Sequence, residues 1–327
     1  MKRTLPALIL VAALLAGCSS SLPAPGDAVA DVPDYAMTGA EPRAITPEPY
    51  ARTPETVLPL EDPDRPVDGA GVLQVTWPDQ AGPIYHPVSL AHYALYMLES
   101  YRTTGTREYL DRAVANAEAL LDGAEERAGA LWFPYGFDYQ LHDDEAQTLT
   151  APWYSGMAQG QALSLFVRLH AETDDDRWTD AADATARTFD ARPGEGGPWF
   201  AHVVDGHLWF EEYVDDAVAP TQVVNGHIYA AFGLYDYATR TGDPDAAQLF
   251  DGAATTVAET FDTYRLPGGL SYYCAAQYCI DTDWRPPNYH RGVTKQFESL
   301  ALMTGRGVFL EQAASFRADY AASGASA

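Results

Sequence analysis

The chain has 327 residues and a formal charge of −26, with 46 acidic against 20 basic side chains. A negative charge of this size argues against nucleic acid and against a general attraction to acidic lipid as partners. Acidic, Ala-rich surfaces also arise from salt adaptation or from a compositional bias of the lineage, and this alternative stays open.

The first residues predict a lipoprotein signal peptide over residues 1–17. Two basic residues precede an apolar run over residues 5–15, which is too short for a permanent membrane span. The run leads into the sequence LAGC, whose cysteine is Cys18. We therefore expect a diacylated Cys18 and an extracytoplasmic, membrane-anchored protein, with an ordinary secretory signal as the alternative. Loss of the two basic residues with the leader would take the charge from −26 to −28.

Residues 18–66 are predicted to form a tether. They are rich in Pro, Ala, Asp and Thr and show no sustained apolar period. Residues 67–327, about 260 in number, are enough for a single large domain with a full core.

Four amphipathic helical pairs repeat along this domain at intervals of about 70 residues. The first helices are expected to begin near Val88, Met157, Val223 and Gly292. Each shows apolar residues at the three-and-four spacing of one helical face and ends in a polar turn with Gly or Asp. Ala-rich second helices are expected near residues 108–121, 178–189, 246–261 and 309–320.

Long connections of about 25 to 35 residues join the pairs and carry much of the aromatic content. Their alternation and Gly-rich tips indicate β-hairpins. Long loops in a compact domain are usually functional. We therefore expect an all-α fold, an (α/α) toroid of helical hairpins, whose loops wall a cleft at one end.

Cys274 and Cys279 lie close together in an expected oxidising compartment, so we predict a disulfide between them. Two thiols without neighbouring His or Cys ligands are half a zinc site at best, so no metal is expected. The chain has no phosphate loop and no dinucleotide fingerprint, so no cofactor is expected either.

Several strings occur in a fixed order: YHPVSLAHYAL, PWYSGMAQGQALSLFVRL, WFEEY, VVNGHIYAAFGLYD and NYH. In this order they resemble the C-terminal domain of the D-glucuronyl C5-epimerases over roughly residues 85–303. The resemblance implies an enzyme that converts glucuronate to iduronate in a heparan-type chain, with an acidic polysaccharide as its substrate. It does not indicate the oligomeric state.

The resemblance also implies catalytic residues. The active-site carboxylate of the family falls on Glu212 and the adjacent tyrosine on Tyr213, while two further tyrosines fall on Tyr272 and Tyr289. The chain departs from the family in having VDDAVAP after the EEY string and only the short segment GAGVLQVTWPD, interpreted as a remnant strand, in place of large β-rich N-terminal domains. These departures leave the identity of the polymer open.

The implied chemistry explains these residue types. The hydrogen on carbon 5 of a uronate is acidic only because the adjacent carboxyl holds the developing enediolate, whose charge must be stabilised. Inversion also needs an acid on the opposite face of the ring. A phenol with a pKa of about 10 is a poor base, so we expect cationic groups beside at least one tyrosine. The candidates are His290, Arg291, Arg285 and Lys295, and the first three are also expected to bind substrate.

Further polar and aromatic residues are candidates for binding substrate. Gln159, Gln161 and Asn225 lie near the starts of first helices, where they are expected either to line the cleft or to cap the helices. Trp209 is expected either to stack on a sugar face or to belong to the core. The chain has 20 tyrosines, most of which must be ordinary core or rim residues.

Three functions remain open at this stage. An epimerase and a polysaccharide lyase begin with the same proton removal, and the lyase then expels the 4-linked sugar. A surface glycan-binding lipoprotein that lost the catalyst is the third alternative. The presence of Glu212 and the three tyrosines argues against it.

Overall fold

The structure is a computed structural model, and it describes residues 33–50, 57–77 and 80–325. The predicted signal peptide and Cys18 lie outside these residues. Within the described ranges, every helix is too short or too polar to cross a bilayer. Residues 34–325 belong to one compact unit, whose architecture follows.

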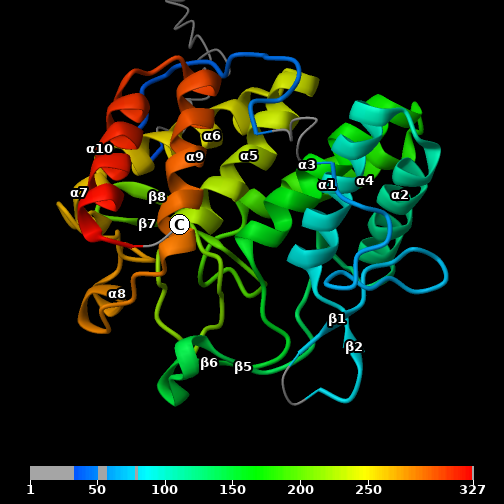
Figure 1. Cartoon of the computed structure of the whole chain (residues 1–327), viewed down its shortest axis with the longest axis horizontal. Coiled ribbons are helices and arrows are strands. Elements are labelled where there is room, and N and C mark those ends of the chain that lie inside the picture. The colour runs from blue at the N-terminus through cyan, green and yellow to red at the C-terminus, as the bar shows by residue number, and fades with distance from the viewer. Residues whose placement is uncertain (1–32, 51–56, 78–79, 326–327) are drawn as a thin grey trace, which may run out of the picture. The chain divides into compact units, whose positions relative to one another are not determined.

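Four antiparallel helical hairpins build this unit, which confirms the predicted (α/α) architecture (Figure 1). They are α1 (Pro87–Thr104) with α2 (Arg107–Asp122), α3 (Gly156–Thr173) with α4 (Arg177–Ala186), α5 (Val224–Thr241) with α6 (Pro244–Glu259), and α9 (Pro287–Thr304) with α10 (Val308–Ser323). The start of α9 was predicted too late, at Gly292. Pro287 stands at a first-turn position, where its fixed φ favours a helix, whereas the polar residues after it hide the apolar period.

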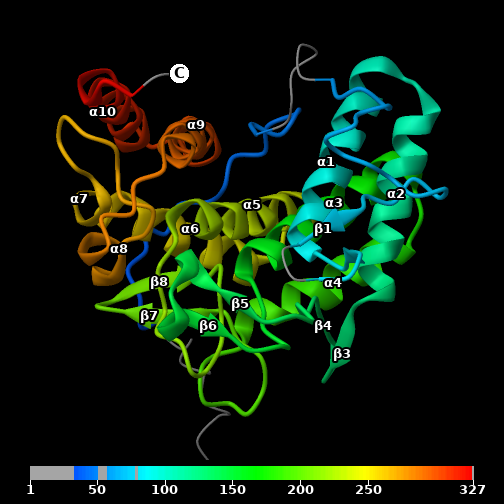
Figure 2. The ribbon, with the colours of Figure 1, turned by 60° about the horizontal axis from the view of Figure 1, so that its bottom comes forward.

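The first helices of the four hairpins form an inner row in the order α1, α3, α5, α9, and the second helices pack behind them (Figures 1 and 2). Two glycines allow α3 and α5 to approach closely. A Cβ on Gly160 would lie 2.4 Å from Ala230 Cα, and one on Gly233 would lie 2.3 Å from Gly160 O. The apolar core lies between the two layers and includes Phe166 and Trp178.

Short antiparallel β-hairpins precede α1 and occupy the first two connections between helical pairs, whereas the third connection, residues 260–286, has no strand pair although its Gly-rich tip also predicted one. They are β1 (Val75–Thr76) with β2 (Pro83–Ile84), β3 (Glu125–Arg127) with β4 (Ala130–Trp132), β5 (Tyr139–Gln140) with β6 (Thr148–Leu149), and β7 (Ala201–Val204) with β8 (His207–Phe210). Two short helices, α7 (Phe261–Tyr264) and α8 (Gln277–Asp281), lie between α6 and α9. The hairpins β5–β6 and β7–β8 lead into α3 and α5.

Much of the predicted tether packs against the helices instead of extending away from them. We call residues 34–50 and 57–76 the N-terminal belt. Asp251 of α6 accepts hydrogen bonds from Thr38 N (2.7 Å), Thr38 Oγ1 (2.6 Å) and Gly39 N (2.6 Å). Arg43 N donates to Met303 O of α9 (2.7 Å). The tether boundary at residue 66 therefore lies too late, because an irregular extended segment can be well packed without any apolar period.

The second part of the belt contacts the first helical hairpin. Leu58 N donates to Ser100 Oγ of α1 (3.2 Å), and Leu58 O accepts from Tyr109 of α2 (2.7 Å). Asn116 of α2 accepts from Leu73 N and donates to Gly71 O, both at 2.9 Å. The described parts of the belt thus contact both the last and the first hairpin of the row.

A buried charge network joins the belt to the inner helices. Arg168 of α3 is 1% exposed and lies 2.9 Å from Asp236 of α5, 3.3 Å from Glu99 of α1 and 3.8 Å from Glu48 of the belt. Tyr50 stacks under the Arg168 guanidinium and hydrogen-bonds to Ser164 (2.6 Å). Charges this deep must be paired, so the network fixes the positions of these elements.

Candidate active site

The backbone that carries Glu212 is fixed by its neighbour Glu211, at the end of β8. Glu211 N donates to Phe200 O (2.8 Å), and Glu211 O accepts from Gly156 N (2.7 Å). Its fully buried carboxylate lies 2.6 Å from His202 Nε2 and accepts from Thr221 N (3.0 Å) and Gln222 N (2.9 Å). These contacts connect β7, the start of α3 and the loop before α5 at one point.

The Glu212 side chain lies against the first turn of α5, away from the partners of Glu211. It is 7% exposed. Gly226 leaves room for it, because a Cβ there would lie 2.3 Å from Glu212 Oε2 and 2.8 Å from Glu212 Cβ. Only glycine at position 226 permits the carboxylate to lie where it does.

Tyrosines surround the Glu212 carboxylate. The hydroxyls of Tyr213 and Tyr273 are 3.1 Å apart, and the Tyr273 and Tyr289 rings meet edge to face at 4.4 Å. Tyr139 of β5 packs against the Tyr213 ring at 5.8 Å. We call these four tyrosines and Glu212 the Glu212 cluster. It draws on β5, the residues directly after β8, residues 271–274 and the first turn of α9.

Burial sets the protonation states of the cluster. It raises the pKa of Glu212 to about 7, helped by the charge of Glu211 and opposed by the hydroxyls of Tyr213 and Tyr273. Burial and then Glu212 raise the pKa of Tyr289 to about 12. The pKa values of Tyr213 and Tyr273 are raised for the same two reasons. Near neutral pH the cluster thus combines a carboxylate poised to accept a proton with protonated phenols.

This result corrects the expectation of cationic groups that favour a phenolate. His290 is 1% exposed and has both ring nitrogens engaged, with Ser271 N at 2.9 Å and Phe316 O at 2.8 Å. Arg291 lies on the exposed side of α9 and bonds Asn288 (2.7 Å).

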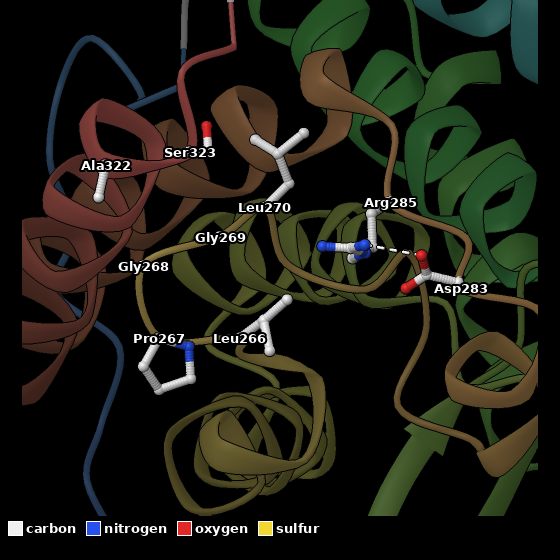
Figure 3. A pocket seen from close by; sticks show the side chains of 9 residues that line it. All are labelled: Leu266, Pro267, Gly268, Gly269, Leu270, Asp283, Arg285, Ala322 and Ser323. Atoms are coloured by element: carbon white, nitrogen blue, oxygen red, sulfur yellow. Dashed lines mark hydrogen bonds and ion pairs between the residues drawn. The ribbon is translucent and has the colours of Figure 1, made fainter.

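Arg285 likewise lies apart from the Glu212 cluster. It pairs with Asp283 at 2.7 Å, in a cavity of about 550 Å³ between residues 266–270 and the end of α10 (Figure 3). Its guanidinium also lies 5.9 Å from the Tyr272 ring.

Tyr273, which sequence reasoning missed, takes the place expected for Tyr272 beside Glu212. Tyr272 is partly buried and packs near Arg285, with its N–H bonded to Tyr264 O (2.9 Å). The backbone bends at Tyr273, whose own N–H donates to Trp284 O (2.9 Å), so the two adjacent tyrosines have different neighbours. The sequence signal was ambiguous, because the two tyrosines are adjacent. Tyr139 of β5 was also missed, since it lies in none of the strings that carry the family resemblance.

The remaining candidates divide between core and cavity. Gln159 is fully buried and bonds Phe133 N, Leu131 O and Thr188, so it ties a loop to α3. Trp209 is 2% exposed and packs on His227. Gln161 lines a cavity on the inner row, and Asn225 borders this cavity through a bond from Gln296 to its carbonyl oxygen (3.0 Å).

The predicted disulfide is present between Cys274 and Cys279, directly after Tyr273. Cys274 also pairs with Val223, the residue before α5. Among the residues that the structure describes, no group of three or more His, Cys, Asp and Glu side chains is placed to hold a metal ion.

With this geometry in view, the comparisons with known proteins define the family. The family described as D-glucuronyl C5-epimerase C-terminus matches residues 127–318, more than half of the chain. The chain belongs to this family. The matched range includes every residue of the Glu212 cluster.

One similar protein bears the name of this family. The D-glucuronyl C5-epimerase of Caenorhabditis elegans is 31% identical over 132 residues, covering 37% of this chain and 21% of that protein. An uncharacterised protein of Methanocaldococcus jannaschii is 23% identical over 193 residues, covering 56% of this chain and 60% of that one. The chain therefore spans less than two thirds of either relative. A solved D-mannose isomerase superposes with a TM-score of 0.54 at 13% identity, covering 80% of this chain and 67% of that one, which shows the fold alone.

Proposed function

We propose that this protein is a carbohydrate epimerase that inverts carbon 5 of a glucuronate-type residue in an acidic polysaccharide. The observation that carries the proposal is the Glu212 cluster, in which one buried carboxylate with a pKa of about 7 lies among protonated tyrosines. Membership of the epimerase family supports it.

In the proposed reaction, the Glu212 carboxylate takes the proton from carbon 5, and the electron pair of the C–H bond moves into the substrate carboxyl as an enediolate. Hydroxyls of the cluster donate hydrogen bonds to the developing charge. A tyrosine O–H on the opposite face, assigned to Tyr289, then delivers a proton to carbon 5. The hydroxyl of Tyr273 lies 3.1 Å from that of Tyr213 and hydrogen-bonds to Tyr289, which offers a path for returning the proton from Glu212 to Tyr289.

A lyase remains the second candidate because the same cluster suits it. Several protonated phenols beside one base could protonate the oxygen of the expelled 4-linked sugar instead of carbon 5. The two reactions differ in product: the lyase leaves an unsaturated uronate that absorbs in the ultraviolet.

The test is incubation of the purified protein with glucuronate polymers in heavy water, followed by NMR. An epimerase incorporates deuterium at carbon 5 and forms the second epimer without new ultraviolet absorbance. New absorbance assigns a lyase. Binding without exchange or cleavage contradicts both and assigns a glycan-binding protein.

We also propose that the protein works outside the cytoplasm, held to a membrane by a lipid on Cys18. The support is the sequence LAGC after an apolar run of signal-peptide length. The cysteine pair Cys274 and Cys279 suits an oxidising compartment.

A further inference from the structure

Two contacts between a histidine and a glutamate involve the β7–β8 hairpin, and their surroundings differ. His202 of β7 lies 2.6 Å from Glu211, whose side chain is 0% exposed, whereas the His202 side chain is 11% exposed. His207 of β8 lies 3.2 Å from Glu259 of α6, which is exposed. Water cannot solvate the Glu211 carboxylate, so this group depends on the few donors that it contacts. The first contact therefore meets a structural requirement that the second does not have.

The Glu211 carboxylate holds the segment that leads into α5. Its Oε2 atom accepts hydrogen bonds from Thr221 N (3.0 Å) and Gln222 N (2.9 Å). Gln222 has a φ of 56°, in the left-handed region that residues other than glycine seldom adopt. A conformation of this kind persists only where its surroundings hold it in place. The hydrogen bonds to Glu211 are part of that hold, and α5 begins two residues later, at Val224.

The same segment determines where two members of the Glu212 cluster lie. Glu212 rests against Gly226, in the first turn of α5. On its other side, Val224 N donates to Tyr273 O (3.5 Å), and Gln222 O accepts from the backbone N–H two residues after Tyr273 (3.0 Å between N and O). The base and one of its tyrosine neighbours therefore depend on one segment, which a single buried carboxylate helps to hold.

We propose that His202 is a positioning residue, which acts through Glu211 on the two cluster members that this segment holds. An ionised carboxylate only accepts hydrogen bonds, so His202 Nε2 donates to Glu211 Oε1 and leaves Oε2 to the two backbone amides. The His202 ring also packs on Trp199, at 5.7 Å, which lies outside the Glu212 cluster. The catalytic consequence rests on the proposed function, whereas the structural consequence does not.

Two amide variants of His202 separate a donor in the right place from a polar group as such. In His202→Gln the side-chain N–H lies near the position of Nε2, whereas in His202→Asn it lies near that of Nδ1 and is too short to reach Glu211. His202→Asn should lower kcat for carbon 5 exchange by about tenfold to a hundredfold and leave KM within about twofold, because a displaced base slows the chemical step. His202→Gln should stay within about threefold of the wild type in kcat.

The control is His207→Asn, which makes the same substitution in the surface contact and should leave kcat and KM within about twofold. His202→Leu fills the space without any donor and should match His202→Asn. Combination with Glu211→Gln tests the route, because in that background His202→Asn should lower kcat by less than about threefold. Equal activities of His202→Gln and His202→Asn, or losses that add in the double variant, would overturn the proposal.

Amide hydrogen exchange of the full protein, read by mass spectrometry over residues 221–226 and 273–276, needs no substrate. His202→Asn should speed exchange in both segments by about tenfold or more, while His202→Gln and His207→Asn keep wild-type protection. If the wild type does not incorporate deuterium at carbon 5 of any polymer, the proposed function fails and this measurement alone decides. Faster exchange in both segments then supports the positioning role, and unchanged protection of either segment overturns it.

Discussion

At the scale of single residues, two adjacent carboxyls have opposite environments. Glu211 accepts hydrogen bonds from two backbone amides and contacts His202, whereas Glu212 Oε2 has no hydrogen-bond partner within the described part of the chain. The backbone bends at Glu212, directly after Glu211, just as it bends at Tyr273, directly after Tyr272. The sequence predicted Glu212, Tyr213 and Tyr289 because their strings are distinctive. It could not select between adjacent tyrosines, since side-chain direction depends on the register of residues 271–274.

The first prediction concerns the stability of Glu212→Gln. The folded-state pKa of Glu212, about 7, lies above its usual 4.5, so ionisation destabilises the folded state as pH rises through this window. Between pH 4 and pH 8 the variant should gain about 3 kcal/mol relative to the wild type. Urea unfolding at both pH values measures this gain. A difference that does not change with pH would show that Glu212 is not held protonated.

The second prediction concerns Glu211→Gln. Glutamine keeps the size of the side chain and an acceptor for Thr221 N and Gln222 N, but removes the charge that raises the pKa of Glu212. The acidic limb of the pH profile of kcat should therefore move to lower pH. Glu126→Gln, a change at an exposed position on β3, should leave the limb in place. If the acidic limb lies at the same pH in both variants and the wild type, the charge of Glu211 does not set the pKa of Glu212.

The third prediction concerns Gly226→Ala. The added methyl group would lie 2.3 Å from Glu212 Oε2, so the carboxylate must move. Small displacements of catalytic groups lower rates by about a hundredfold, so we expect a loss of that order in kcat with a folded protein. A methyl group added at Gly292 would lie in open space, so Gly292→Ala should retain activity. Equal activity of the two variants would contradict the position assigned to Glu212.

At the scale of elements, periodicity explains what the sequence could predict. The helices were found because apolar residues repeat at their spacing, and the Gly and Asp turns marked their ends. The N-terminal belt was missed because its contacts are individual hydrogen bonds and single side chains such as Tyr50 and Leu58. The close approach of α3 and α5 was missed too, since a glycine in a helix does not reveal its neighbour.

The fourth prediction tests the belt. Asp251→Ala removes the acceptor of three hydrogen bonds from Thr38 and Gly39, so it should lower the free energy of unfolding by about 2–3 kcal/mol. Asp245→Ala, at an exposed position on the same helix, is the control and should change it little. Thermal unfolding of both variants measures the effect. Equal stabilities would mean that the belt is only loosely attached.

At the scale of the whole molecule, the family match covers the Glu212 cluster and begins at residue 127, after the N-terminal belt and the first helical hairpin. The fold and the family could be predicted from the order of the strings. The polymer could not, because the strings that carry the resemblance do not include the VDDAVAP segment, where the chain departs from the family.

The fifth prediction concerns the lipid anchor. Expressed with its own leader, the protein should partition into detergent if Cys18 is acylated as we propose, since the lipid would then supply the anchor. Cys18→Ala should block processing or release the protein into the aqueous phase. Mass spectrometry of the N-terminus provides the direct check, and an unacylated wild-type protein would contradict the proposal.

The central claim is that Glu212 and Tyr289 transfer protons on opposite faces of the sugar ring. The most direct test is to measure deuterium exchange at carbon 5 separately from each epimer. Glu212→Gln and Tyr289→Phe should each lower epimerisation by about a hundredfold or more. Each should abolish exchange from only one epimer, whereas Tyr320→Phe on α10 should resemble the wild type. Near wild-type exchange from both epimers in Glu212→Gln and Tyr289→Phe would contradict the account.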